Sequence, residues 1–210
     1  MTRRLLARGG DRRTGDALRV SDQLTEAQCR SILAAIELAW LDGRPFNRFV
    51  TLLWEHGGID ARLNAQTTRR WLHHAQGFLR QHGEHLAHCW VQEWGSRKGA
   101  HVHALLHIPP RLDPLFRSKP LHWTKLCLPG KYVSGTTQCQ RIAASRDPED
   151  NAAAYRAALM GKVHYMLKYA PAELEALLDM NIWRSPWSKS WGRTGMTIGS
   201  RIGRWQHRKT

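Results

Sequence analysis

Two histidines separated by one apolar residue, in the stretch His101-Val102-His103, are the first feature of this sequence that could do chemistry. On a β-strand, side chains alternate between the two faces, so both imidazoles would point to the same side. Two imidazoles on one face can bind a divalent metal ion. The chain has 12 histidines, so the pair by itself fits two exposed histidines on a basic strand equally well.

The segments on either side of this pair predict a β-hairpin. Residues 88–94 and 100–108 are apolar and β-prone, and Gly95-Ser96-Arg97-Lys98-Gly99 lies between them. Such a pattern is typical of two antiparallel strands joined by a five-residue loop.

A carboxylate on the first strand strengthens the metal interpretation. If the loop is centred on Arg97, position 93 lies opposite position 101, and Glu93 shares a face with His101 and His103. Opposed and diagonal neighbours on antiparallel strands are about 5 to 8 Å apart, so the three side chains can meet around one ion. The alternative is that Glu93 pairs with Arg97 or Lys98 and that no metal binds.

A second candidate stands further along the chain, at Tyr165-Met166-Leu167-Lys168-Tyr169. An Ala-rich helix is predicted over 148–169, and at about 100° per residue it would place Tyr165, Lys168 and Tyr169 on one face. A phenol can attack a phosphodiester, but its ordinary pKa near 10 means that a nearby cation must assist it. A helix that packs two tyrosines on the core fits the same pattern.

The remaining pattern predicts an α+β fold with a central antiparallel sheet of about four to five strands and helices packed on one side. The five prolines between 109 and 135 predict a largely irregular segment with a short strand near 123–128. Apart from the hairpin, the other predicted elements are helices at 26–42, 65–81 and 148–169 and strands at 49–54 and near 137–143.

Composition favours a single basic domain with an anionic partner. The chain has 210 residues, a formal net charge of +15, 42% hydrophobic residues and 10 Trp. Its four cysteines form no C-x-x-C pair, which is typical of reduced thiols in a cytoplasm. No apolar run is long enough to span a bilayer, so no membrane partner is expected.

At these residues the sequence resembles the HUH endonuclease superfamily, and it is most similar to rolling-circle replication initiators. Phe49-Val50-Thr51-Leu52-Leu53 resembles their F-x-T-L strand, and Glu93 stands where they often place a third metal ligand. His101-Val102-His103 resembles the metal-binding motif, and Tyr165-x-x-Lys168 resembles the nucleophile motif. The order and spacing agree over residues 46–170.

The resemblance implies an RRM-like, or ferredoxin-like, HUH core in which the tyrosine helix faces the metal. Glu93, His101 and His103 would hold one Mg²⁺ or Mn²⁺ ion. Tyr165 would attack single-stranded or hairpin DNA at an origin in a bacterial cell, leaving a 5′-phosphotyrosine, while Lys168 steadies charge. The DNA would belong to a plasmid or phage.

Two points within that resemblance stay open. Tyr169 makes the motif similar to the paired tyrosines of some phage initiators, but Ala170-Pro171-Ala172 follows instead of another lysine. Relaxases tend to use three histidines, which makes His107 the rival of Glu93. On an extended strand, however, His107 lies about 13 Å from His103, too far to share an ion.

Three segments are predicted: a basic flexible arm at 1–20, the endonuclease domain at 21–182, and a basic, Trp-rich nucleic-acid-binding segment at 183–210. A structural role for the tail tryptophans fits the sequence equally well. No G-x-x-x-x-G-K-[ST] motif is present, so no nucleotide cofactor is expected, and a host helicase and polymerase would act separately. The predicted DNA-binding residues are Arg97, Lys98, Arg184, Trp187, Lys189, Trp191, Arg193, Arg201 and Arg204.

Two other functions fit the same residues. A transposase or mobilisation relaxase would use the same chemistry on a different DNA. A non-catalytic DNA- or RNA-binding protein would use the basic charge alone, with the histidines binding a structural ion or none.

Overall fold

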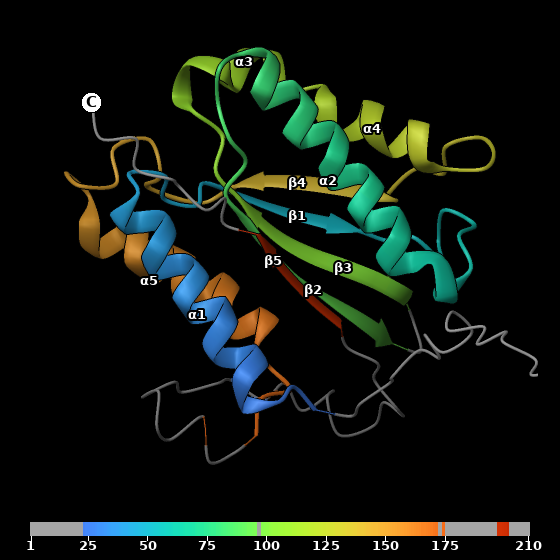
Figure 1. Cartoon of the computed structure of the whole chain (residues 1–210), viewed down its shortest axis with the longest axis horizontal. Coiled ribbons are helices and arrows are strands. Elements are labelled where there is room, and N and C mark those ends of the chain that lie inside the picture. Colours follow the sequence, from blue (N-terminus) through green and yellow to red (C-terminus); the bar gives the residue numbers. More distant parts are fainter. Residues whose placement is uncertain (1–22, 96–97, 172–173, 175–196, 202–210) are drawn as a thin grey trace, which may run out of the picture.

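The computed structural model describes residues 23–95, 98–171, 174 and 197–201. Within them the chain forms an α+β fold with a single antiparallel sheet and helices on both of its faces (Figure 1). The helices and strands are α1 (Glu26–Leu41), β1 (Arg48–Leu52), α2 (Asn64–Gln81), β2 (His88–Gly95), β3 (Gly99–Leu106), α3 (Asp113–Phe116), α4 (Lys119–Cys127), β4 (Thr137–Arg141), α5 (Ala152–Met166) and β5 (Thr197–Arg201). None of the described helices is both long and apolar enough to cross a membrane.

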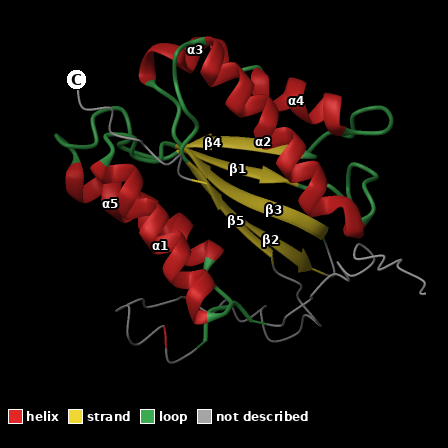
Figure 2. Ribbon diagram, in the orientation of Figure 1, coloured by secondary structure: helices red, strands yellow, loops and turns green. Residues whose placement is uncertain are grey.

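The sheet has the strand order β4-β1-β3-β2-β5, which places the β2–β3 hairpin near its middle (Figure 2). The predicted register is confirmed, because Glu93 pairs with His101 and Val91 pairs with His103. The strands also continue to the pair Gly95 and Gly99. The connection is therefore tighter than the five-residue loop that the sequence predicts.

Helices cover both faces of the sheet, so the prediction that they pack on one side is wrong. One cluster of buried side chains joins α1 and α5 to one face, and a second joins α2 and α4 to the other. The reason lies in β1, where Phe49 enters the first cluster and its neighbour Val50 the second. A strand that is buried on both faces needs a layer on each side.

The first two long helices form where the sequence predicts them. The capping box that begins α1 is present, since the Thr25 hydroxyl accepts from the Gln28 amide at 3.3 Å and the Gln28 side chain accepts from the Thr25 amide at 2.8 Å. In α2, the apolar stripe packs on the sheet through Trp71, Leu72, Ala75, Phe78 and Leu79.

The proline-rich segment is mostly helical, so the predicted irregular chain and the strand near 123–128 are both wrong. A 3₁₀ turn at Pro110–Leu112, α3 and α4 follow one another. Proline stands in the first turn of each, where its missing amide hydrogen breaks no helical hydrogen bond. These prolines therefore begin helices.

The last strand lies in the predicted nucleic-acid-binding tail, where no strand is predicted. Thr197–Arg201 pairs with His88–Gln92 and extends the sheet beyond β2. The arm at 1–20 and the rest of the 183–210 segment lie outside the described residues, and the domain boundaries stay predictions.

Candidate active site

A carboxylate and two imidazoles meet on the sheet at the end of the hairpin. Glu93 of β2 and His101 and His103 of β3 each offer a ligand atom, and these atoms lie within 4.8 Å of one another. Oε2 of Glu93 is 3.3 Å from Nε2 of His101 and 3.9 Å from Nε2 of His103. All three side chains are buried. The predicted ligands therefore form a group that can hold a metal ion.

Each histidine ring is oriented through its other nitrogen. Nδ1 of His101 donates to the Gly99 carbonyl at 2.8 Å, and Nδ1 of His103 lies 3.0 Å from the Thr51 hydroxyl. The Phe49 ring stacks on His103, with centroids 5.4 Å apart. These contacts turn both Nε2 atoms toward Glu93, as the contacts around metal-ligating histidines commonly do.

Thr51 is a residue of the site that the sequence analysis does not assign. The sequence contains part of the signal for this role, because Thr51 belongs to the F-x-T-L stretch. In the structure, Thr51 of β1 pairs with His103 of β3. The missing information was the order of the strands, which decides that β1 lies beside β3.

The donor chemistry of the group fits a divalent cation. An imidazole that carries its proton on Nδ1 alone presents a lone pair at Nε2, and the Nε2 atoms of both histidines face the Glu93 carboxylate. Among the described residues, Nε2 of His103 and Oε1 of Glu93 have no hydrogen-bond partner although both atoms are buried. One carboxylate with two imidazoles suits Mn²⁺, Co²⁺ and Zn²⁺, and Mg²⁺ through the carboxylate.

The electrostatics keep Glu93 and His103 in the forms that bind metal. Burial tends to raise the pKa of Glu93, but the hydrogen bond with His101 and the nearby positive charges lower that pKa to about 2. Burial lowers the pKa of His103 to about 3 against the attraction of Glu93. At neutral pH, Glu93 is therefore ionised and His103 is neutral.

Lys168 lies directly against this group. Its Nζ is 2.6 Å from Oε2 of Glu93, and it stands 4.1 Å from the ring centroid of Tyr165 and 5.2 Å from that of Tyr169. Burial lowers the pKa of Lys168, but the Glu93 carboxylate outweighs it and the net pKa is raised. A charged ammonium group therefore lies close to both the carboxylate and the two tyrosine rings.

The helix that carries Tyr165 ends earlier than predicted. The last helical residue of α5 is Met166, and Leu167 caps it, so Lys168 and Tyr169 lie in the turn that follows. The Leu24 amide holds this turn by donating to the Tyr169 carbonyl at 2.9 Å. The three side chains still gather, although through the turn rather than on one helix face.

Tyr165 itself lies beside a residue of the metal-capable group and remains accessible. Its ring meets that of His103 nearly edge-on, with centroids 4.8 Å apart, and 39% of its surface is exposed. A phenol in this position can be reached by a large substrate while it lies close to the metal-capable group.

The hairpin turn needs glycine at position 99. Gly99 has φ of +60°, and a Cβ atom there would collide with the Glu55 side chain. The same Glu55 carboxylate accepts from the Ala100 amide at 2.6 Å. Glu55 and Gly99 therefore fix the backbone from which His101 projects.

His107, which the sequence makes the rival of Glu93, does not join the group. Nδ1 of His107 donates to the Pro45 carbonyl at 2.7 Å, and the metal-capable group contains Glu93 and not His107. In the described part of the chain, no other set of three His, Cys, Asp or Glu residues could hold an ion.

The predicted DNA-binding residues are placed only in part. Lys98 is exposed at the hairpin turn, and its positive charge is among those that lower the pKa of His103. Arg201 lies in β5, which fixes only its backbone. Arg97, Arg184, Trp187, Lys189, Trp191, Arg193 and Arg204 lie outside the described residues.

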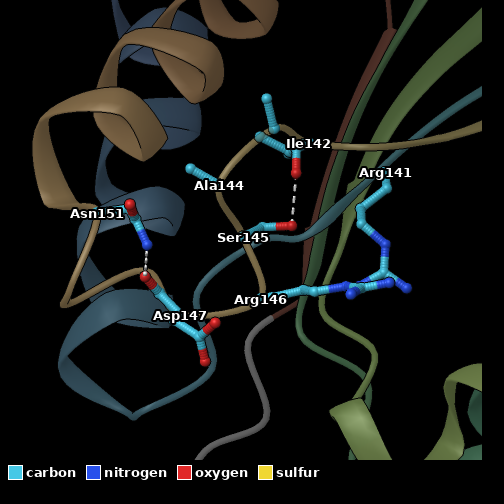
Figure 3. Close-up of a pocket in the computed structure, with 8 residues that line it drawn as sticks. Arg141, Ile142, Ala144, Ser145, Arg146, Asp147 and Asn151 are labelled. Atoms are coloured by element: carbon cyan, nitrogen blue, oxygen red, sulfur yellow. Dashed lines mark hydrogen bonds between the residues drawn. The ribbon is translucent and has the colours of Figure 1, made fainter.

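A hollow of about 260 Å³ opens at the other end of the strands, in the loop between β4 and α5 (Figure 3). Ser145 donates there to the Ile142 carbonyl at 2.6 Å. Arg141, on its rim, forms an ion pair with Asp113, which also pairs with Arg48. The charge of Arg141 is thus neutralised within the protein.

The fold and the site define a class of protein: an α+β domain that can hold one ion on a central hairpin beside an accessible tyrosine. The family model of the replication-associated protein ORF2 matches residues 47–173, more than half of the chain, and the chain belongs to this family. The match spans the metal-capable group and Tyr165, and it confirms the predicted family. Searches of curated proteins and of solved structures found no match.

Proposed function

We propose that this protein is a metal-dependent endonuclease that nicks and rejoins single-stranded DNA at a replication origin, with Tyr165 as its nucleophile. The reaction would initiate rolling-circle replication of a phage or plasmid in the bacterial cytoplasm. The family assignment supports a replication nuclease with a DNA partner. The observation that carries the chemistry is the position of the Tyr165 ring, whose centroid is 4.8 Å from that of His103 and 4.1 Å from Nζ of Lys168.

Glu93, His101 and His103 would hold the metal, which we propose to be Mg²⁺ or Mn²⁺. When bound, such an ion stabilises negative charge on the phosphate oxygens and fixes the phosphate in place. Thr51 and the Gly99 carbonyl keep the two rings turned toward the ion-binding position.

Tyr165 would supply the attacking oxygen. Its Oη forms a bond to the scissile phosphorus while the bond from phosphorus to the 3′ oxygen breaks. The phenolic proton is lost to solvent and the leaving oxygen takes one up, so the products are a free 3′ hydroxyl and a 5′-phosphotyrosine. Because the phosphodiester energy is retained in this link, the reverse attack by a 3′ hydroxyl rejoins the strand.

Lys168 would assist by charge. Its ammonium faces the ring of Tyr165 and remains protonated at neutral pH, so it favours the phenolate and the negative charge on phosphate. The ring of Tyr169 lies 5.2 Å from the same ammonium. We propose that Tyr169 serves as a second nucleophile after Tyr165 has been used.

The test uses a pool of random single-stranded DNA, because the recognised sequence is not needed to detect a covalent product. The protein is incubated with the labelled pool and Mn²⁺, denatured, digested with protease and analysed by mass spectrometry. We expect a nucleotide adduct on Tyr165 that is absent in Tyr165→Phe and absent when EDTA is added. Tyr132→Phe, which changes a tyrosine outside the site, should leave the adduct unchanged.

Two results would overturn the proposal. One is the absence of any nucleotide on tyrosine in the wild-type protein, and the other is strand cleavage that continues with EDTA present. The Tyr169→Phe variant tests whether the protein uses one tyrosine or two. If Tyr165 is the only nucleophile, the variant should rejoin strands normally. If both tyrosines are needed, the variant should cut once and accumulate the adduct.

A further inference from the structure

Lys168 contacts the same oxygen of Glu93 that faces both histidines. Its Nζ is 2.6 Å from Oε2, and the Nε2 atoms of His101 and His103 are 3.3 Å and 3.9 Å from that oxygen. Oε2 is therefore a ligand atom of the metal-capable group that already accepts from a cation of the protein. An ion held by this group would have to share the oxygen with the ammonium.

The surroundings strengthen this contact. The Glu93 side chain is 2% exposed and the Lys168 side chain 22% exposed, so water and salt screen their charges weakly. A lysine ammonium is positive at neutral pH. Its Nζ also lies 4.1 Å from the ring centroid of Tyr165 and 5.2 Å from that of Tyr169. The two aromatic rings thus help to keep the positive charge next to the carboxylate.

Charge makes the ammonium and a divalent ion competitors. The metal-capable group has one carboxylate and two imidazoles. The single negative charge of Glu93 cannot balance both a divalent ion and the ammonium of Lys168. Two cations that lie close together in a weakly screened site repel each other. The affinity of the group for an ion should therefore be lower than its three ligands alone would give.

We infer that Lys168 lowers the affinity of the group for its metal ion until DNA is bound. The inference rests on the proposed function, since it takes Glu93, His101 and His103 as the metal ligands. It adds a role in metal loading to the proposed role of Lys168 in the chemistry. A DNA phosphate in the site brings negative charge, which offsets the ammonium and its repulsion of the ion. Metal and DNA then bind cooperatively, and each raises the affinity for the other by the same factor.

The first experiment measures the Mn²⁺ affinity of the full chain without DNA. Free Mn²⁺ is followed by electron paramagnetic resonance while the protein is titrated. Lys168→Met removes the ammonium, and Lys168→Arg keeps a positive charge at the same position. The control is Lys162→Met, which removes one charge from α5, where Lys162 lies over the ring of Phe49. Circular dichroism checks that the three variants fold.

We expect Lys168→Met to bind Mn²⁺ about tenfold more tightly than the wild type, because a positive charge next to the ligands is lost. Lys168→Arg and Lys162→Met should both bind nearly as the wild type does. A gain in affinity distinguishes this role from a merely structural one, since a site damaged by the substitution would bind the ion more weakly.

The second experiment measures the coupling to DNA. It uses the Tyr165→Phe variant, which lacks the proposed nucleophile. Its affinity for a labelled pool of random single-stranded DNA is measured by fluorescence polarisation with and without Mn²⁺. We expect Mn²⁺ to raise this affinity about tenfold. When Lys168→Met is added, the increase should be smaller, because the repulsion that DNA relieves is no longer present.

Four results would overturn the inference. Equal or weaker Mn²⁺ binding in Lys168→Met would show that the ammonium does not oppose the ion, and the nuclease proposal would stand if the adduct on Tyr165 still forms. An equal gain in Lys162→Met would mean that only net charge matters. An unchanged effect of Mn²⁺ on DNA affinity after Lys168→Met would exclude the coupling. If neither the wild type nor Lys168→Met binds Mn²⁺, the proposed metal site is itself wrong.

Discussion

The two faces of the sheet are built from the same strands but contain different chemistry. The face under α2 and α4 is an aromatic core that includes Trp54, Trp71 and Trp90. The face under α1 and α5 is apolar beside the helices, but at the hairpin end it holds Glu93, His101 and His103. Strand alternation allows this, because neighbours such as Thr51 and Leu52 face opposite layers.

The comparison shows how this fold combines stability with a polar site. The α2 and α4 layer packs without a metal-capable cluster, whereas in the other layer α5 ends at Met166 and Tyr165 is left partly exposed. Substitutions on the first face should therefore reduce stability, and substitutions on the second should reduce chemistry or metal binding.

The largest expected effect is on the aromatic face. Trp71 is fully buried, and its Nε1 donates to Thr124 at 3.1 Å. Trp71→Ala should lower the free energy of unfolding by about 3 to 5 kcal/mol, measured by urea denaturation, without changing metal affinity. Trp40→Ala, at a side chain that is 43% exposed, should cost much less. Similar losses in the two variants would contradict the distinction.

On the other face, Lys168→Met should leave the fold intact and slow the chemistry. Removing the ammonium beside Tyr165 should reduce the rate of adduct formation by about 10²- to 10³-fold, measured in single-turnover assays. Lys162→Met makes the same change on α5, where Lys162 lies over Phe49 at 5.0 Å, and should be nearly neutral. A normal rate in Lys168→Met would exclude the proposed role of this lysine.

Metal binding should stabilise the folded protein through the polar group alone. At a concentration of Mn²⁺ about 100 times its Kd, the wild-type free energy of unfolding should rise by about 2.7 kcal/mol. Glu93→Gln should abolish this increase, whereas His107→Gln should retain it. Thermal unfolding with and without Mn²⁺ makes the measurement, and an undiminished increase in Glu93→Gln would place the ion elsewhere.

The smallest effect concerns pH. Burial holds the pKa of His107 below its ordinary value of 6.5, outweighing the hydrogen bond to Pro45. As pH falls below about 6.5, His107 takes up a proton in the unfolded chain but stays neutral in the folded protein. The free energy of unfolding therefore decreases as the pH is lowered from neutral. The loss is at most about 1.4 kcal/mol per pH unit. His107→Gln should make the stability curve shallower between about pH 6.5 and 5, and an unchanged slope would contradict this.

The local parts of the site follow from the sequence. Two strands of alternating side chains and a glycine-bounded turn predict that Glu93 faces His101, and the register agrees. The contact between Lys168 and Glu93 does not follow from it. It depends on where α5 ends and how the next turn bends, which tertiary packing decides.

The errors in the predicted fold have related causes. Pro120 occupies the first turn of α4, where proline is tolerated. The sequence does not show where this helix starts, so the same proline is taken as a residue that interrupts a helix. The strand Thr197–Arg201 is short and contains a glycine, and its pairing with β2 spans about a hundred residues of sequence, so no local pattern marks it.

The hydrogen bond from Leu24 to Tyr169 has a practical consequence for anyone who shortens this protein. Leu24 is buried just before α1. Its amide is hydrogen-bonded to the turn that contains Lys168, which pairs with Glu93. An expression clone that started at Glu26 would keep every described helix. It would nevertheless lose the hydrogen bond that holds the turn containing Lys168. Trimming from the amino terminus should therefore stop before Leu24.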